Sequence, residues 1–295
     1  MTCGQIEMKP STLHLPAGPW RSVLDCLCAH FPAVGRDVWL DRFTRQRVLS
    51  EQGHPLESDH PYREGLRVRY FREVPNEAPV PFREQVLFQD AHLLVVDKPH
   101  FLPVVPAGSY VQETLLNRPV KRCNNPHLTP LHRLDRLTAG LVMFSCNPQT
   151  RDAYQALFRE QRIAKRYVAL AAPLPRLGLP LVRKTRLERG EPFFRMQESV
   201  GAPNSETRIE VEQRFDSSWR YALYPVSGRK HQLRLHMAGM GAAILNDPLY
   251  PTLSDAPEDH CKPLQLLAQR LSFSDPLDNQ VRVFTSQLSL ETPNQ

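Results

Sequence analysis

PLHRLDRLTAGLVMF, residues 130–144, places one carboxylate, that of Asp135, between two arginines and just ahead of a small-residue turn and an apolar run. The segment before the aspartate, HLTPLHRL, is typical of a strand, and LTAG after it is typical of a turn. An aspartate in such a place most often accepts hydrogen bonds from backbone N–H groups. Any further role for Asp135 has to be argued from the other segments of the chain.

Composition indicates a globular protein with one large core and a small appendage. The chain has 295 residues, of which 41% are hydrophobic and 23% are charged. The apolar run LLVV at 93–96 falls far below the roughly 20 residues that a membrane-spanning helix needs. The first residues, MTCGQIEMKPST, lack the basic-then-apolar pattern of a signal peptide. We therefore expect a cytoplasmic protein without a membrane partner.

The net charge and the cysteine spacing indicate which binding partners and metal sites to expect. A formal net charge of +6 and a pI near 9.1 favour a polyanionic partner, although a basic pI alone is a weak signal for nucleic acid. The six cysteines are scattered, and Cys26 and Cys28 form a close pair that no second pair or spaced histidine pair accompanies. This spacing does not indicate a zinc site, so we expect reduced thiols.

The pattern of the chain changes at VPNEAPVP, residues 74–81, which has the proline content of a linker. Beyond it, short apolar segments such as HLLVVDKP, YVALAA and RYALYPV are typical of strands. One helix is predicted among them, with Asn147 as its cap and Pro148 in its first turn. The fold class is therefore α+β, with residues 1–80 as a front part and residues 81–295 as the main domain.

Five segments accompany the HRLD motif in a particular order. They are VVDKPHFLPVVPAG (95–108), KRYVAL (165–170), SGRKHQLRLHMAGMG (227–241), ILNDPLY (244–250) and LLAQRLSFSDP (266–276). In order and spacing these segments resemble the motifs of the RluA-type pseudouridine synthases, over roughly residues 82–285. The resemblance implies the pseudouridine synthase fold, which is a mixed, largely antiparallel central sheet flanked by helices.

The resemblance also implies the site residues. Asp135 takes the place of the family's catalytic nucleophile, Tyr167 that of the tyrosine that stacks on the target base, and Arg234 that of the arginine paired with the aspartate. Arg133 corresponds to a position associated with reaching into the RNA when the base is displaced. The substrate-binding set expected from the same motifs is Arg133, His132, Thr138, Gly228, Arg229, His231 and Gln232.

The chemistry of uridine isomerisation explains why these side chains would be enough for catalysis without a cofactor. The N1–C1′ bond of uridine breaks, the base turns, and C5 bonds to C1′, so that nothing is oxidised and nothing leaves. One carboxylate can serve as nucleophile or acid–base group, and no cofactor or metal is expected. Attack at C1′, attack at C6 and a glycal intermediate all remain open.

The environment of the aspartate can also be anticipated. A buried carboxylate stays ionised beside a guanidinium, for which Arg234 is the candidate. If QLRLH is a strand, Leu233 and Leu235 face the core and Arg234 faces the opposite side. For Lys98 and Pro99 we expect a structural role, with the proline ending a strand and the lysine near the surface.

The front part, residues 20–72, resembles a degenerate S4-type RNA-binding module, and the resemblance implies a small α/β domain. Its basic residues Arg36, Arg42, Arg45 and Arg47 suggest that it grips RNA, while a cap that packs on the main domain is the alternative.

The leading hypothesis for the whole chain is a monomeric enzyme that isomerises uridines in structured RNA, either ribosomal or transfer RNA. The alternative is a non-catalytic RNA-binding protein that keeps the fold. A metal-dependent hydrolase using His132 and Asp135 is a third hypothesis, but the sequence offers no convincing ligand set for it.

Overall fold

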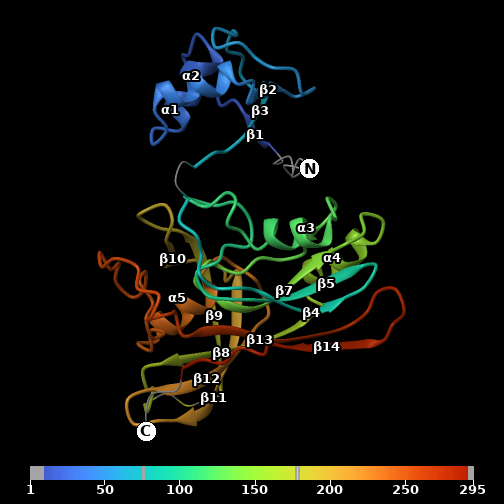
Figure 1. The fold of residues 1–295 in the computed structure, drawn as a ribbon. Coiled ribbons are helices and arrows are strands. Elements are labelled where there is room, and N and C mark those ends of the chain that lie inside the picture. Colours follow the sequence, from blue (N-terminus) through green and yellow to red (C-terminus); the bar gives the residue numbers. More distant parts are fainter. Residues whose placement is uncertain (1–9, 75–76, 177, 179, 292–295) are drawn as a thin grey trace. The chain divides into compact units, whose positions relative to one another are not determined.

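The structure is a computed structural model that describes residues 10–74, 77–176, 178 and 180–291 (Figure 1). The chain divides into two compact units, residues 1–76 and residues 77–295. In the described part of the chain, no helix is long and apolar enough to cross a membrane. Part of the proline-rich segment 74–81 and the first nine residues lie outside the described residues.

The first unit is a three-stranded antiparallel sheet with two helices. Its elements are β1 (Ser11–His14), α1 (Val23–His30), α2 (Arg36–Thr44), β2 (Val48–Ser50) and β3 (Arg67–Tyr70), and the strand order is β1-β3-β2. The hydroxyl of Ser22 caps α1 by accepting a hydrogen bond from the amide of Asp25. Trp39, 1% exposed, is the largest side chain of the core. The small α/β unit expected from the sequence is therefore present.

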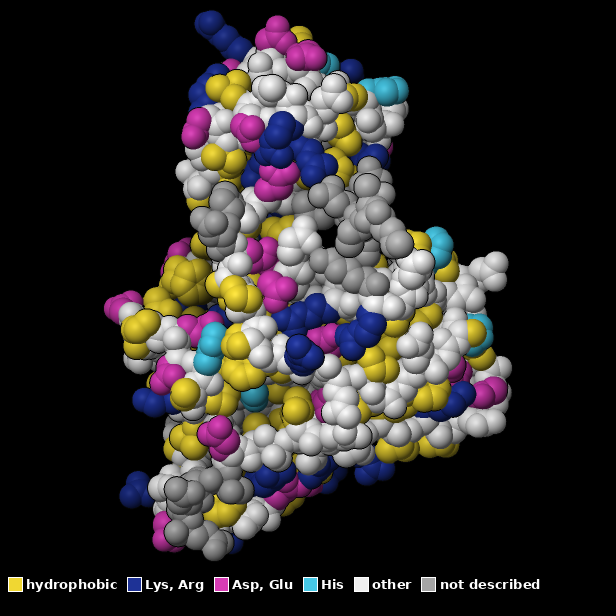
Figure 2. Space-filling view, viewed as in Figure 1, with side chains coloured by type: hydrophobic (Ala, Val, Ile, Leu, Met, Phe, Trp, Pro, Cys, Tyr) yellow, Lys and Arg dark blue, Asp and Glu magenta, His cyan; other side chains and the backbone are white. Residues whose placement is uncertain are grey.

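Four arginines of the first unit do not form a free basic surface. Each contacts an acidic residue or its backbone: Arg36 with Asp25, Arg42 with the Glu73 carbonyl, Arg45 with Asp41 and Glu73, and Arg47 with Glu73. On the face shown in Figure 2, arginine side chains of this unit lie beside Asp and Glu. Three of these cations are therefore paired with carboxylates within the unit, and Arg42 is only 5% exposed.

The second unit is built on one large sheet of short strands. They are β4 (Gln85–Gln89), β5 (Leu93–Lys98), β6 (Thr129–Pro130), β7 (Ala139–Ser145), β8 (Ala164–Ala171), β9 (Leu181–Arg189), β10 (Met196–Ser199), β11 (Ser205–Arg214), β12 (Trp219–Pro225), β13 (Leu266–Ser274) and β14 (Val281–Thr285). The order along the sheet is β10-β9-β11-β12-β8-β13-β7-β5-β4, with β14 paired to β13 and β6 to β7. The pair β7–β13 is parallel, and the other pairs are antiparallel. The predicted mixed, largely antiparallel sheet is confirmed.

Small residues after the HRLD motif allow β7 and β13 to meet. Gly140 has φ +109°, and a Cβ atom placed on it would lie 2.3 Å from the carbonyl oxygen of Ala268. A larger residue would clash with this backbone, so the turn LTAG fixes where β7 starts. The strands β5 and β7 are buried along their whole length, as expected at the centre of a covered sheet.

The described part of the second unit also contains the helices α3 (Asn117–Cys123), α4 (Arg151–Arg159) and α5 (Gln232–Gly239). The prediction for the start of α4 was wrong. Asn147 forms a turn in which its side-chain oxygen accepts from the amide of Gln149, and the helix begins only at Arg151. Asparagine favours such local turns as much as helix caps, which explains the error.

The strand predicted for QLRLH was also wrong, because these residues form α5. All residues from Gln232 to Met237 are buried, so the segment has no exposed face. A fully buried segment shows neither the strand period nor the helix period, and the sequence could not distinguish the two.

Part of the segment 74–81, for which the sequence predicts a linker, is instead packed in the second unit. Val80 is 6% exposed and belongs to a core cluster of the second unit. The carboxylate of Glu77 accepts hydrogen bonds from three consecutive amides, those of Val111, Gln112 and Glu113. Residues 77–80 therefore pack as part of the second unit.

Candidate active site

Asp135 lies in the connection between β6 and β7, where the turn that follows it is closed by a hydrogen bond. The amide of Thr138 donates to the carbonyl of Asp135 at 3.1 Å. The side chain of Asp135 is 27% exposed, so one side of the carboxylate is open while the other faces the protein. This half-buried position suits a group that has to reach a substrate.

Arg234, on α5, is the cation nearest to this carboxylate. Its Nη1 atom lies 3.6 Å from Oδ2 of Asp135, and its side chain is 2% exposed. The same guanidinium donates from Nε and Nη2 to Asp247 at 2.8 and 2.6 Å. Asp247, 1% exposed, is thus the bidentate partner of the arginine. The pairing predicted from sequence is present, but it is the longer of the two.

His231 lies near the other carboxylate oxygen of Asp135, and its backbone is left-handed, with φ +57°. Its Nε2 atom lies 3.9 Å from Oδ1 of Asp135, and its Nδ1 atom shares a hydrogen bond of 2.8 Å with the hydroxyl of Tyr250. Burial lowers the pKa of His231 to about 4, although the charge of Asp135 works in the opposite direction. The imidazole is therefore neutral at pH 7 and adds no second cation beside the carboxylate.

Tyr167 is on β8, where it pairs with Leu223 of β12 and Ala268 of β13. Its ring packs against two of the core clusters of the second unit. Burial raises the pKa of the phenol, and the negative charge of Asp135 raises it further. The phenol therefore stays protonated, and the charge effect shows that Tyr167 and Asp135 share one environment.

The prediction that Lys98 lies near the surface was wrong. Lys98 ends β5 with 0% exposure, and its Nζ donates to the carbonyls of Pro99, Leu102 and Arg136 at 2.9, 2.8 and 3.1 Å. Three acceptors match the three N–H groups of an ammonium. Burial lowers the pKa of Lys98 to about 7, and the charge of Asp135 partly offsets that effect. Because Arg136 follows Asp135 directly, Lys98 fixes the backbone beside the carboxylate.

The basic segment 227–232 is organised by Gln232. Its amide donates to the carbonyl of Glu206 and the hydroxyl of Thr207, and its oxygen accepts from Ser227 and from the amide of Arg229. All the polar groups of this side chain are therefore used inside the protein. Gly228 and Arg229 are exposed, and the Arg229 side chain donates to the carbonyl of Asn204.

The remaining residues of the predicted substrate-binding set separate into two groups. Arg133 is exposed and forms no ion pair with any residue that the structure describes. His132 accepts a hydrogen bond from the amide of Met143 and stacks on Phe158 at 4.7 Å, and burial lowers its pKa to about 3. These contacts give His132 a structural place under β7. Thr138 is 3% exposed.

Around the Asp135 carboxylate, four separate parts of the fold thus come together: the β6–β7 connection itself, α5 with its N-cap, β8 and β5. They supply Asp135, then Arg234 and His231, then Tyr167, and finally Lys98. Among the residues described, there is no group of three or more His, Cys, Asp or Glu side chains that could hold a metal ion. The sequence did not predict that Asp247 pairs with Arg234 or that Lys98 is buried. The available signal was a charged residue inside an otherwise apolar segment.

Comparison with known proteins identifies the arrangement. The model of the RNA pseudouridylate synthase family matches residues 92–239, about half of the chain. The dual-specificity RNA pseudouridine synthase RluA of Salmonella typhi is 32% identical over 199 residues, which cover 65% of this chain and 87% of that protein. An RNA pseudouridine synthase of Synechocystis is 28% identical over 245 residues, covering 77% of this chain and 79% of that protein.

The fold agrees with these matches. The structure of the human RNA pseudouridylate synthase domain containing 4 protein superposes with a TM-score of 0.56 at 24% identity, and the match covers 71% of this chain and 94% of that one. The chain therefore belongs to the RluA family of RNA pseudouridine synthases.

Proposed function

We propose that this chain isomerises specific uridines of ribosomal or transfer RNA to pseudouridine, with Asp135 as the catalytic nucleophile. The observation that carries the proposal is the half-exposed carboxylate of Asp135, held 3.6 Å from the buried guanidinium of Arg234. A nearby cation keeps a carboxylate ionised as water is excluded from around it. An ionised carboxylate is the form that can act as a nucleophile.

The reaction needs groups that hold a detached base and return it in a new orientation. The N1–C1′ bond breaks, the C5–C1′ bond forms, and the proton that leaves C5 is balanced by the one gained at N1. In this proposal Tyr167, half-buried and protonated, stacks on the base and gives a neutral surface beside the carboxylate. Stacking of a base on an aromatic ring is worth about 1–3 kcal/mol, which offsets part of the cost of base flipping.

Arg133 and the exposed part of segment 227–230 are the proposed contacts to the RNA around the target nucleotide. Arg133 lies two residues before Asp135 in the same short connection, and its exposed guanidinium has no acidic partner among the described residues. An unpaired arginine beside the carboxylate can occupy the space that the base leaves in the helix. His132 and Gln232 act in this proposal through the loops that they fix.

Substitution of Asp135 by asparagine tests the role of the carboxylate. We expect Asp135→Asn to fold and to bind RNA but to release no tritium from RNA labelled at C5 of uridine, because asparagine has nearly the same size but is not a nucleophile. The matched control is Asp152→Asn, at an aspartate whose side chain is 84% exposed. Turnover near wild type in Asp135→Asn would falsify the assignment.

The RNA itself is identified by a second experiment. Pseudouridine maps of total RNA from cells with and without the gene should differ at one or a few sites in ribosomal or transfer RNA. Loss of those sites in cells that carry Asp135→Asn would show that catalysis, rather than binding alone, produces them. Maps without any difference would favour the non-catalytic RNA-binding alternative.

A further inference from the structure

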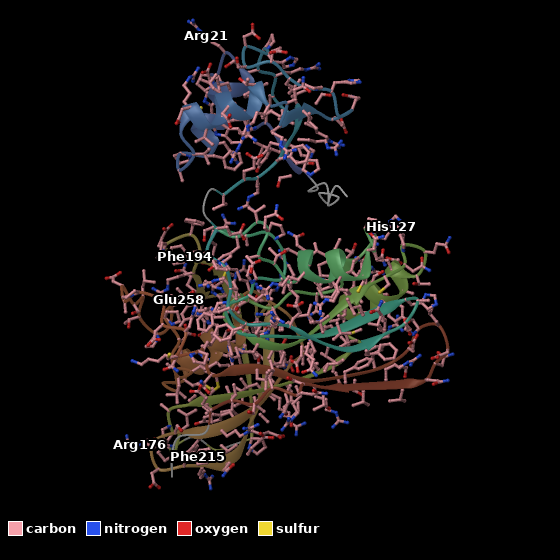
Figure 3. The ribbon with its side chains drawn as sticks, viewed as in Figure 1. Arg21, His127, Arg176, Phe194, Phe215 and Glu258 are labelled. Carbon is pink, nitrogen blue, oxygen red and sulfur yellow. The ribbon has the colours of Figure 1, made fainter. Side chains whose placement is uncertain are left out.

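Two phenylalanines stand exposed at the turn between β9 and β10. Phe193 is 72% exposed and Phe194 is 37% exposed. Their rings meet edge to face, with centroids 5.6 Å apart. Figure 3 labels Phe194 in this turn. Adjacent large aromatic side chains left in water are unusual on a protein surface and often mark a binding site.

The turn that carries the pair is held in place. The amide of Arg195 donates to the carbonyl of Pro192 at 2.8 Å, and the amide of Gly190 donates to the carbonyl of Arg195 at 3.2 Å. Lys230 then donates from Nζ to the carbonyl of Phe194 at 2.8 Å. The rings are thus presented on a fixed backbone, which lowers the entropy lost when a ligand binds.

The same turn is joined to the active site. Lys230 directly precedes His231, the neighbour of Asp135. On the other side, the guanidinium of Arg195 lies 5.1 Å from the ring centre of Tyr250, and that ring also lies 5.3 Å from the guanidinium of Arg234. The amide of Met196 donates to the Tyr250 hydroxyl. The aromatic pair is therefore continuous with the residues that surround the carboxylate.

We propose that Phe193 and Phe194 form a stacking platform for an unpaired RNA base next to the target uridine. This inference rests on the proposed function. When one nucleotide is turned out of a helix or loop, its neighbour loses a stacking partner. Proteins that read single-stranded RNA replace that partner with aromatic rings. Lys230, whose Nζ atom contacts the Phe194 carbonyl, lies beside the platform, and with the adjacent Arg229 it suits the phosphates on either side of that base.

The experiment measures binding of a probe that the active site cannot turn over. Binding of a fluorescein-labelled twelve-nucleotide oligoadenylate is followed by fluorescence anisotropy at several salt concentrations. We expect about tenfold weaker binding for the double variant F193A/F194A, equivalent to about 1.4 kcal/mol. Because the lost contact carries no charge, the slope of log Kd against log salt should stay as in the wild type.

Two controls separate stacking from general apolar contact. The double variant F193L/F194L keeps the apolar surface without the rings and should bind as weakly as the alanine variant. Val200→Ala, at an apolar residue that is fully exposed, should bind as the wild type does. Thermal unfolding of every variant should match the wild type, since both rings are exposed.

Several results would overturn the platform. They are wild-type affinity in F193A/F194A, full rescue by leucine, or a change from dimer to monomer in light scattering, which would make the pair a self-association surface. Oligoadenylate contains no uridine, so the assay does not depend on turnover by Asp135. Failure of the platform and failure of the proposed function are therefore separate outcomes.

Discussion

Arg234 is oriented by Asp247 more closely than by Asp135. Two of its nitrogens donate to Asp247 at 2.8 and 2.6 Å, whereas its nearest approach to Asp135 is 3.6 Å. The bidentate contact fixes the plane of the guanidinium. As a result, Nη1 is the nitrogen presented to Asp135. The buried guanidinium of Arg234 therefore contacts two carboxylates, that of the buried Asp247 and that of the partly exposed Asp135.

The first prediction follows from this shared cation. Asp247→Asn should lower the free energy of unfolding by about 3–5 kcal/mol, the usual cost of breaking a buried ion pair, and should also slow turnover because Arg234 loses its fixed plane. Arg234→Ala should lose stability on the same scale and leave Asp247 unpaired. Urea unfolding and tritium release measure the two effects.

The control for this prediction is Asp152→Asn, which breaks an exposed pair with Arg159 and should change stability by less than about 1 kcal/mol. Asp135→Asn should separate the two readouts, with turnover abolished and stability little changed. An Asp247→Asn protein as stable and as active as the wild type would show that Asp247 does not position the arginine.

The second prediction concerns acid stability. His236 is fully buried, and its ring nitrogens hydrogen-bond to the hydroxyls of Thr185, Ser205 and Thr207. Burial lowers its pKa from 6.5 to about 4. Below pH 6.5 His236 binds a proton in the unfolded chain but stays neutral in the folded chain. The free energy of unfolding therefore falls as the pH falls, and it levels off below about pH 4. Between pH 7.5 and 5 this one group should cost about 2 kcal/mol.

Urea unfolding at both pH values checks the sign. His236→Gln keeps hydrogen-bonding capacity without a titrating ring, so its stability should fall less on acidification than that of the wild type. His127→Gln, at an exposed histidine, should follow the wild type. An equal fall in the His236→Gln and wild-type proteins would place the acid sensitivity in other groups.

The mixed sheet and the nearness of Arg234 to Asp135 were expected from the resemblance of the motifs, which depends on their order and spacing. Prediction from the sequence failed where a charged residue is buried among apolar ones. Lys98 was expected near the surface, yet three backbone carbonyls satisfy its ammonium, and only a folded structure brings Leu102 and Arg136 to it. Likewise, the residues from Gln232 to Met237 of α5 are all buried, so their hydrophobic pattern shows neither a helix period nor a strand period.

The role of Asp247 shows the same limit. Asp247 lies in the segment ILNDPLY, and its carboxylate accepts hydrogen bonds from the amides of Leu249 and Tyr250, as a turn aspartate does. The same carboxylate also binds Arg234, which is thirteen residues earlier in the chain. The turn contacts of Asp247 are local and can be anticipated from the sequence, whereas its contact with Arg234 forms only in the folded protein.

The last prediction concerns the first unit. It carries ten Lys and Arg against nine Asp and Glu, a net charge of +1, and its clustered arginines are already balanced by acids. Deleting residues 1–76 is the appropriate cut, because Glu77 and Val80 pack within the second unit. The fragment 77–295 keeps Asp135, Tyr167 and Arg234, so it should fold and turn over saturating RNA at nearly the full rate.

The affinity of the fragment 77–295 for RNA should fall only slightly. The salt dependence of binding measures how many phosphate contacts are lost. Each phosphate contact adds about 0.7–0.9 to the slope of log K against log salt. Because the unit has little net charge, we expect the fragment to bind RNA more weakly, with a slope shallower by about one or less. A slope shallower by three or more would mean that Arg45 and Arg47 exchange Glu73 for RNA phosphates, and the unit would then be a true RNA grip. Identical slopes and affinities would make it a cap, and a fragment that cannot fold would show that the two units depend on each other for stability.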